Sequence, residues 1–207
     1  MQKPAIKAVV FDLYKTLISE PQGKGISPYR NLYSQLGLPE EDYLTARRIF
    51  MTEYLGSFEA VAERLVPGAR IDTAECHRLY EEAVAAIALY PEVELVLDEL
   101  KKRGLLVGLI SNLSTLFKRP FFELGLADYF DQIVFSFEVG FVKPNSEIYR
   151  IMIRRLGLRP EEIIMTGDQY SKDVDAPRLA GMQAVHLDRS GKSPGSIPDL
   201  THIFQYL

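Results

Sequence analysis

The sequence predicts an α/β fold in which a parallel sheet lies between two layers of helices and one all-helical segment is inserted. Two observations predict it. Five short apolar runs alternate with helical patterns of about ten residues, which is typical of right-handed βαβ units around a parallel sheet. The stretch 19–89 contains no run typical of a strand, so the alternation is broken once, after the first strand.

Each expected strand is short and nearly continuous in apolar residues, as in strands covered on both faces. The strands are expected at 6–11, 105–110, 133–135, 163–165 and 184–187. The helices between them are expected at 93–102, 113–124, 146–156 and 171–180, and residues 188–199 are expected to form a surface loop. This order of elements predicts a Rossmann-like, three-layer core.

The inserted stretch carries helix-start signals of its own. Its four helices are expected to begin at Ser27-Pro28, Pro39, Ser57 and Asp72. Asp72 with Glu75 resembles a capping box, and the fourth helix is expected to reach Tyr90. A stretch this long is better explained by a subdomain than by a plain crossover connection. We therefore expect a core formed by 1–18 and 90–207 and an α-helical-bundle cap formed by 19–89.

Composition excludes several classes of function. The 24 basic and 28 acidic side chains of the 207-residue chain give a net charge of -4, which argues against non-specific nucleic-acid binding. The single cysteine, Cys76, excludes an internal disulfide and a thiolate zinc cluster. No apolar run approaches the roughly 18 residues of a membrane span, and the first apolar run is too brief for a signal peptide. We expect a cytoplasmic monomer or homodimer without a membrane or nucleic-acid partner.

Polar side chains follow the ends of the expected strands. Asp12 follows the first strand, Ser111-Asn112 the second, and Gly167-Asp168 the fourth, with Asp173 shortly after it. Lys143, which is expected to open a helix, lies beyond the third strand. In parallel α/β sheets, ligands bind outside the carboxyl ends of the strands, so we expect these groups to meet at one edge.

Three carboxylates gathered at one edge require protons or a cation. Two carboxylates about 4 Å apart repel by roughly 4 kcal/mol at an effective dielectric constant near 20. Mg²⁺, a hard ion that keeps several waters, fits carboxylates with room for phosphate oxygens. Lys143 adds a point charge suited to an anionic group.

These residues resemble the four ordered motifs of the haloacid dehalogenase superfamily, most of whose members are phosphatases. The matching segments are Asp12-Leu13-Tyr14-Lys15-Thr16-Leu17, Ser111-Asn112, Lys143-Pro144, and Gly167-Asp168 with Asp173. Each motif alone is short, but all four stand in order at an expected strand end or helix start. The resemblance covers 9–187, and the helical insert resembles the α-helical cap of that superfamily.

The resemblance implies a role for each matching residue. Asp12 would be the nucleophile that forms an aspartyl-phosphate, and Lys143 would neutralise charge on Asp12 and on the transferring group. Ser111 would hydrogen-bond a phosphoryl oxygen. Asn112 would help to hold its loop, and Thr16 would brace the nucleophile loop.

The resemblance also implies a bound ion and a class of substrate. Asp12, Asp168, Asp173 and the backbone carbonyl of Tyr14 would hold Mg²⁺. The expected substrate is a small phosphorylated metabolite, and the cap, whose residues do not form a readable code, would determine which one.

Tyr14 departs from the phosphatase pattern, which usually has a second aspartate at this position as general acid and base. At pH 7 a free tyrosine donates a proton, but only about one molecule in a thousand accepts one. The same Asp-x-Tyr pattern resembles the metal-independent 2-haloacid dehalogenases, whereas Asp168 with Asp173 resembles the magnesium-binding pattern of phosphatases. A Mg²⁺-dependent phosphatase is the leading hypothesis, a dehalogenase with Asp12 as nucleophile is the first alternative, and a catalytically weak ligand- or partner-binding protein is the second.

Overall fold

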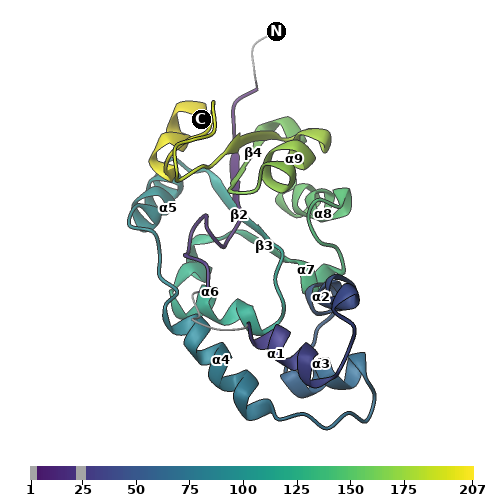
Figure 1. The fold of residues 1–207 in the computed structure, drawn as a ribbon. Coiled ribbons are helices and arrows are strands. Elements are labelled where there is room, and N and C mark those ends of the chain that lie inside the picture. Colours follow the sequence, from purple (N-terminus) through teal and green to yellow (C-terminus); the bar gives the residue numbers. More distant parts are fainter. Residues whose placement is uncertain (1–3, 22–26) are drawn as a thin grey trace.

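The computed structural model describes residues 4–21 and 27–207 and centres on a five-stranded parallel sheet (Figure 1). The strands are β1 (Ala8–Phe11), β2 (Leu106–Ser111), β3 (Gln132–Phe135), β4 (Ile163–Gly167) and β5 (Gln183–His186). Their order in the sheet is β3-β2-β1-β4-β5, and all neighbours are parallel. The α/β fold is confirmed, and each strand ends within two residues of its predicted bounds.

Helices cover both faces of the sheet, as predicted. Val9 and Phe11 of β1 belong to an apolar cluster with α5 (Val93–Lys102) and α6 (Arg119–Glu123). Ala8 and Val10 point the other way, into a cluster with α8 (Ser146–Leu156) and α9 (Ala176–Leu179). In Figure 1, α5 lies on one side of the sheet and α8 with α9 on the other. Alternate side chains of β1 therefore pack against different helical layers, one on each face of the sheet.

The helix predicted at 113–124 is shorter than expected. The Ser136 hydroxyl, at the start of α7 (Ser136–Val139), lies 3.1 Å from Leu113 N and 3.2 Å from Leu113 O. These contacts keep the backbone of Leu113 out of a helical pattern. A 3₁₀ turn follows at Leu116–Lys118, and α6 begins only at Arg119.

The helix predicted at 171–180 is split into two types. Tyr170–Asp175 form a π-helical turn, and only Ala176–Leu179 are α-helical. Pro177 has no N–H to donate to the carbonyl of Asp173 four residues earlier, so the regular α pattern is interrupted there. This turn carries Asp173 into the sheet edge.

The four helices predicted in the insert are present and lie below the sheet in Figure 1. They are α1 (Pro28–Gln35), α2 (Tyr43–Thr52), α3 (Phe58–Leu65) and α4 (Thr73–Ala85). The Ser27, Ser57 and Asp72 side chains cap α1, α3 and α4 as expected. Their aromatic residues pack together, with the Tyr29 and Phe50 rings stacked at 4.6 Å.

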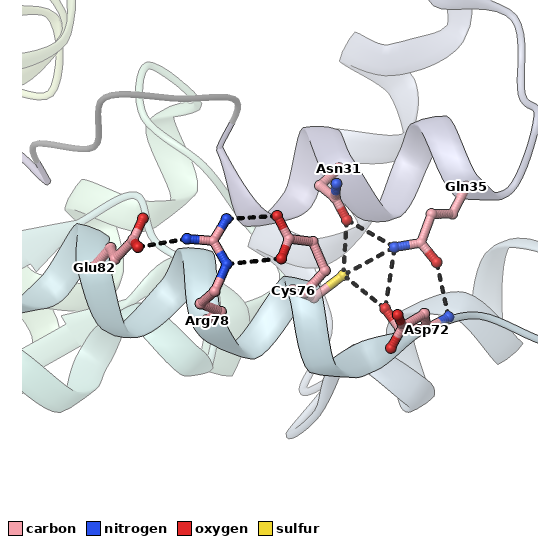
Figure 2. Close-up of polar contacts among 7 residues, drawn as sticks. Asn31, Gln35, Asp72, Cys76, Arg78 and Glu82 are labelled. Carbon is pink, nitrogen blue, oxygen red and sulfur yellow. Dashed lines mark hydrogen bonds and ion pairs between the residues drawn. The ribbon is translucent and has the colours of Figure 1, made fainter.

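The predicted capping box of α4 is only half formed. The Asp72 carboxylate accepts the Ala74 N–H at 3.0 Å, but the Asp72 N–H donates to Gln35 Oε1 of α1 at 2.8 Å (Figure 2). Glu75 forms an ion pair with Arg78 at 2.6 Å instead of reaching back. A contact between helices has thus replaced the contact within α4.

The helix α4 ends at Ala85, five residues before the predicted end. The chain then runs beside the segment that leaves β1: Ser19 N donates to Ala88 O at 2.9 Å, and Tyr90 N donates to Leu17 O at 3.1 Å. These backbone bonds replace helical ones. The chain enters and leaves the insert through two adjacent, paired segments.

The loop at 188–199 is more ordered than its composition indicates. The Asp188 carboxylate accepts backbone N–H groups of Ser190, Lys192 and Ser193 at 2.9, 3.0 and 2.7 Å. Hydrogen bonds from the side chains of Ser190 and Ser193, and then from their backbones, lower the pKa of Asp188 below its ordinary range. Across residues 4–21 and 27–207, no helix combines the length and apolar character needed to cross a bilayer.

Candidate active site

Lys143 lies at the centre of the site. Its ammonium group is 2.6 Å from Asp12 Oδ1 and 2.7 Å from Asp173 Oδ1, and all three side chains are buried. Asp12 directly follows β1, and Asp173 lies in the π turn after β4, the strand beside β1. Adjacent parallel strands therefore place the two carboxylates together, as the sequence predicted.

The position of Lys143 in the chain differs from the prediction. It lies in the loop before α8, whose N-cap is Asn145, rather than opening the helix. Asn112 holds this loop: its Oδ1 accepts the Lys143 N–H at 2.7 Å, and its Nδ2 donates to Lys143 O at 2.8 Å. Asn112 thus fixes the backbone from which the ammonium group reaches the carboxylates.

Three carboxylates gather at the sheet edge. Asp12, Asp168 and Asp173 each offer an oxygen, and these oxygens lie within 4.8 Å of one another. Asp168 Oδ1 is buried, and no hydrogen-bond partner for it occurs in the described part of the chain. A buried oxygen without a donor is costly unless a cation or water satisfies it. The donor set therefore fits a hard divalent cation.

Gly167 allows the close approach of Asp173. A Cβ atom at position 167 would lie 2.5 Å from Asp173 Cγ, closer than non-bonded atoms approach. The Asp173 carboxylate is also held by the backbone N–H of Gln169, at 3.0 Å from Oδ2. No sequence pattern indicated that this glycine serves to admit the carboxylate.

Burial and like charges raise the pKa values of two of the acids. Burial raises the pKa of Asp12 to about 7; Lys143 opposes this rise, while Asp173 and Asp168 add to it. Burial, and then Asp173, also raise the pKa of Asp168. Burial lowers the pKa of Lys143, but Asp12 and Asp173 together outweigh it and raise the value above its usual range. Lys143 is thus a permanent cation, and a second cation would favour ionised Asp12.

The Tyr14 side chain is hydrogen-bonded away from the carboxylates. Its hydroxyl donates to the carbonyl oxygen of Phe117 at 2.8 Å. Burial raises the pKa of Tyr14 above that of a free tyrosine, with a smaller contribution from Tyr80. Tyr14 is therefore even less able to accept a proton at neutral pH than the sequence suggested.

The loop that follows Asp12 is held by contacts of its backbone. Lys15 has a φ of +63°, which is uncommon for a residue other than glycine. The Thr16 hydroxyl is buried and has no hydrogen-bond partner among the residues described. The Thr16 carbonyl accepts from Arg189 Nη2 at 2.7 Å. The bracing contact of this loop thus runs to the Thr16 backbone, and the sequence did not suggest its donor.

Arg189 also contacts the segment by which the chain returns from the insert. Its guanidinium lies 3.5 Å from the centre of the Tyr90 ring and forms a 2.6 Å ion pair with Glu92. The group is four-fifths buried. Because Arg189 lies in a loop without periodicity, no sequence pattern indicated it.

A cavity of about 430 Å³ lies between the sheet edge and the insert. Asp12, Ser111 and Lys143 line its core side. The insert contributes aromatic and apolar walls, among them Tyr29, Tyr43, Phe50 and Met51. Ser111 and Asn112 both face this space, so the predicted strand-end residues and the insert enclose one site.

Hydrogen bonds fasten the insert to the segment after β2. Tyr29 donates its hydroxyl hydrogen to Ser114 Oγ at 2.7 Å, and Tyr80 donates to Leu116 O at 2.8 Å. The Leu55 N–H donates to Thr115 Oγ1 at 3.1 Å. The insert is thus held against the core beside the cavity in this conformation.

A profile of haloacid dehalogenase-like hydrolases matches residues 6–181. The chain belongs to that family. The chain is 40% identical over 115 residues to phosphoserine phosphatase from Thermus thermophilus, a match covering 54% of this chain and 46% of that protein. It is 28% identical over 197 residues to glyceraldehyde 3-phosphate phosphatase from Methanopyrus kandleri, covering 89% of this chain and 84% of that protein.

The chain spans about half the length of the Thermus relative. The crystal structure of an HAD phosphatase from Thermococcus onnurineus superimposes with a TM-score of 0.68 at 24% identity, covering 97% of each chain. At that identity the likeness shows the fold, and the chemistry rests on the residues of the site.

Proposed function

We propose that this hydrolase is a Mg²⁺-dependent phosphatase that acts on a small phosphorylated metabolite through an aspartyl-phosphate on Asp12. One observation carries the proposal: the buried carboxylates of Asp12 and Asp173 and the half-buried carboxylate of Asp168 meet at the sheet edge, and Asp168 leaves an oxygen without a donor in the described structure. The names of the Thermus and Methanopyrus relatives, both phosphatases, support this reaction class.

The first step is attack by an Asp12 oxygen on phosphorus, with cleavage of the bond between phosphorus and the ester oxygen. Lys143, 2.6 Å from Asp12, orients the nucleophile and offsets charge on the phosphoryl group. Ser111 lines the same cavity and would donate a hydrogen bond to a phosphoryl oxygen. Asn112 acts through Lys143 as a positioning residue, and Thr16 would contribute its backbone to the nucleophile loop.

Asp12, Asp168, Asp173 and the backbone carbonyl of Tyr14 would hold the metal ion. When bound, Mg²⁺ supplies positive charge that stabilises ionised carboxylates and phosphoryl oxygens. The Asp173 carboxylate is held in place by the backbone N–H of Gln169 and by Lys143. Asp168 Oδ1 has no hydrogen-bond donor in the described structure, so it would be available to the metal ion.

In the second step, water attacks phosphorus, Asp12 is released and inorganic phosphate forms. The leaving alkoxide of the first step takes a proton from water, and the attacking water of the second step gives its proton to solvent water. Because the Tyr14 hydroxyl is bound to Phe117 O and has a raised pKa, Tyr14 does not transfer either proton. We expect slow turnover of esters with poor leaving groups.

We further propose that residues 19–89 form the cap and that 1–18 and 90–207 form the catalytic core. The paired crossings at Ser19 and Ala88, and at Leu17 and Tyr90, support these boundaries. The insert also covers the cavity that contains Asp12. In this arrangement the cap excludes water and selects the substrate.

One observation favours a metal-independent dehalogenase instead: Tyr14 stands two residues after Asp12. A halide leaves without a proton, so that reaction needs no general acid. The carboxylate cluster argues against it, because a haloacid substrate gives no use for Asp168. A weakly catalytic binding protein is the remaining alternative, and Tyr14 is its support.

The distinguishing experiment measures phosphate release from p-nitrophenyl phosphate and chloride release from 2-chloropropionate, each with Mg²⁺ and with EDTA. We expect phosphate release that requires Mg²⁺ and disappears in Asp12→Asn. Chloride release that EDTA does not affect would refute the phosphatase proposal and support the dehalogenase alternative. Lack of both activities, with no Mg²⁺ binding by calorimetry, would support the ligand- or partner-binding alternative.

A further inference from the structure

Asp168 stands directly beyond the last pair of the ladder between β4 and β5. Gly167, the last residue of β4, pairs with His186, the last residue of β5. The Gly167 carbonyl accepts the Leu187 N–H at 3.0 Å, and the Asp168 carbonyl lies past this bond. The backbone of Asp168 therefore needs a hydrogen-bond donor from outside the ladder.

The imidazole of His186 provides this donor. Its Nε2 lies 3.1 Å from Asp168 O. A carbonyl oxygen accepts hydrogen bonds and has no hydrogen to give, so the His186 ring must carry a hydrogen on Nε2. A doubly protonated ring also carries a hydrogen there, so the contact does not depend on the charge of the ring.

The ring and the backbone of His186 are themselves held in place. The Tyr170 ring packs edge to face against the imidazole, with 5.3 Å between the ring centres. The His186 carbonyl accepts the Ile197 N–H at 2.8 Å. Tyr170 is the first residue of the π turn that carries Asp173, so His186 contacts the chain both at Asp168 and at the start of this turn.

The direction of the Asp168 carboxylate depends on its backbone. Its Oδ1 has no donor among the described residues, whereas the Asp173 carboxylate is held by Gln169 N and by Lys143. A hydrogen bond to the carbonyl of Asp168 restrains the peptide plane of that residue, and with it the direction in which the side chain leaves the backbone. Resting on the proposed function, we propose that His186 is a positioning residue that directs the Asp168 carboxylate toward the metal ion.

Two substitutions at position 186 separate the hydrogen bond from the ring. His186→Phe keeps a ring against Tyr170 but removes the donor. His186→Gln restores a donor without a ring, because Nε2 of glutamine stands the same number of bonds from Cβ as Nε2 of histidine. Calorimetry should show that His186→Phe binds Mg²⁺ about tenfold or more weakly than wild-type protein, whereas His186→Gln keeps most of the wild-type affinity. The reverse order would assign the effect to ring packing and would overturn the proposal.

The dependence of turnover on Mg²⁺ should follow the same order. For p-nitrophenyl phosphate, the Mg²⁺ concentration that gives half the maximal rate should rise about tenfold or more in His186→Phe. The kcat at saturating Mg²⁺ should stay near the wild-type value, because Asp12 and Lys143 are unchanged. A lower kcat with an unchanged Mg²⁺ requirement would contradict the positioning role.

His202→Phe is the matched control. His202 is exposed and pairs with Asp199 at 3.1 Å, in the 3₁₀ helix Leu200–Tyr206. This variant should keep the wild-type affinity for Mg²⁺. Thermal unfolding of each variant checks that it is folded, and His186→Leu, which also lacks the donor, replaces His186→Phe if that variant does not fold.

Nuclear magnetic resonance separates failure of this role from failure of the proposed reaction. Spectra of the ring nitrogens in the metal-free protein should show a hydrogen on Nε2 of His186, and the carbonyl carbon resonance of Asp168 should shift more in His186→Phe than in His186→Gln. A hydrogen on Nδ1 alone overturns the proposal whether or not phosphate esters are hydrolysed. If His186→Phe binds Mg²⁺ as tightly as wild-type protein, the positioning role is refuted while the phosphatase stands. If wild-type protein binds no Mg²⁺, the proposed reaction fails and the role of His186 fails with it.

Discussion

Under the proposed mechanism, replacing Tyr14 by aspartate should accelerate phosphate-ester hydrolysis. At pH 7 a tyrosine with its ordinary pKa is ionised in about one molecule in a thousand, and burial raises the pKa of Tyr14 further. A positioned carboxyl group typically contributes about 10²–10⁴ to the rate by general acid–base catalysis. We take the lower end, because aspartate is shorter than tyrosine, and expect kcat for ethyl phosphate to rise about 100-fold in Tyr14→Asp.

The gain in rate comes with a loss of stability. The variant loses the hydrogen bond from the Tyr14 hydroxyl to Phe117 O, which costs about 1 kcal/mol of the free energy of unfolding. Tyr14→Phe is the control, because it loses the same hydrogen bond without gaining an acid. In urea it should be destabilised less than Tyr14→Asp, which also loses the ring that packs against the apolar core, while its kcat stays near the wild-type value.

Stopped-flow kinetics with p-nitrophenyl phosphate identify the step that Tyr14 leaves slow. The nitrophenolate leaves without a proton, so wild-type enzyme should release a burst equal to one product per active site, followed by slow turnover. Tyr14→Asp should remove the burst because hydrolysis of the aspartyl-phosphate accelerates. A folded Tyr14→Phe that loses most of its activity would refute this reasoning, since it would give the hydroxyl a direct role.

Three further results are expected. Gly167→Ala should weaken Mg²⁺ binding in calorimetry about tenfold or more, because the added Cβ displaces Asp173. Gly56→Ala is the control, because its Cβ would meet its nearest atom at 3.8 Å, and it should keep the wild-type affinity. Equal Mg²⁺ affinities in the two variants would contradict the account. Because the pKa of Asp12 is raised to about 7 from 3.8, its contribution to stability is full below pH 3.8 and is lost as the pH rises toward about 7. Urea unfolding without metal should show that the free energy of unfolding falls as the pH rises, and Mg²⁺ should reduce this fall. If Mg²⁺ leaves the fall unchanged, Asp12 is not a ligand of the metal ion. Arg189→Ala should lower the free energy of unfolding by about 1–3 kcal/mol and lower kcat more than it changes KM, since the nucleophile loop loses its bracing donor; unchanged kcat would assign Arg189 to stability alone.

The sequence predicted the sheet and its polar edge because both follow from local patterns. Apolar runs mark strands buried on both faces, and parallel strands bring their carboxyl ends to one edge. Asp12 and Asp168 could therefore be placed together from the positions of two strands alone. Three of the four insert helices were equally predictable from their caps, as at Ser57. The second, α2, begins at Tyr43 without a side-chain cap, four residues after the expected start at Pro39.

The remaining features depend on contacts between distant segments. The end of α4 at Ala85 is determined by backbone pairing with residues 17–19, which no helical pattern indicates. The π turn that carries Asp173 and the reach of Arg189 to the nucleophile loop likewise require the folded chain. For Tyr14 the sequence indicated the missing acid, and the structure adds where the hydroxyl goes instead.

The most direct test of the central claim is to trap the phosphorylated enzyme. Acid quenching during turnover of p-nitrophenyl phosphate with Mg²⁺, followed by peptide mass spectrometry, should find one phosphoryl group on the peptide that contains Asp12. The modification should be removed by hydroxylamine and should be missing from Asp12→Asn and from samples quenched in EDTA. An enzyme that turns over the ester while its only phosphoryl group is on another residue would contradict the account.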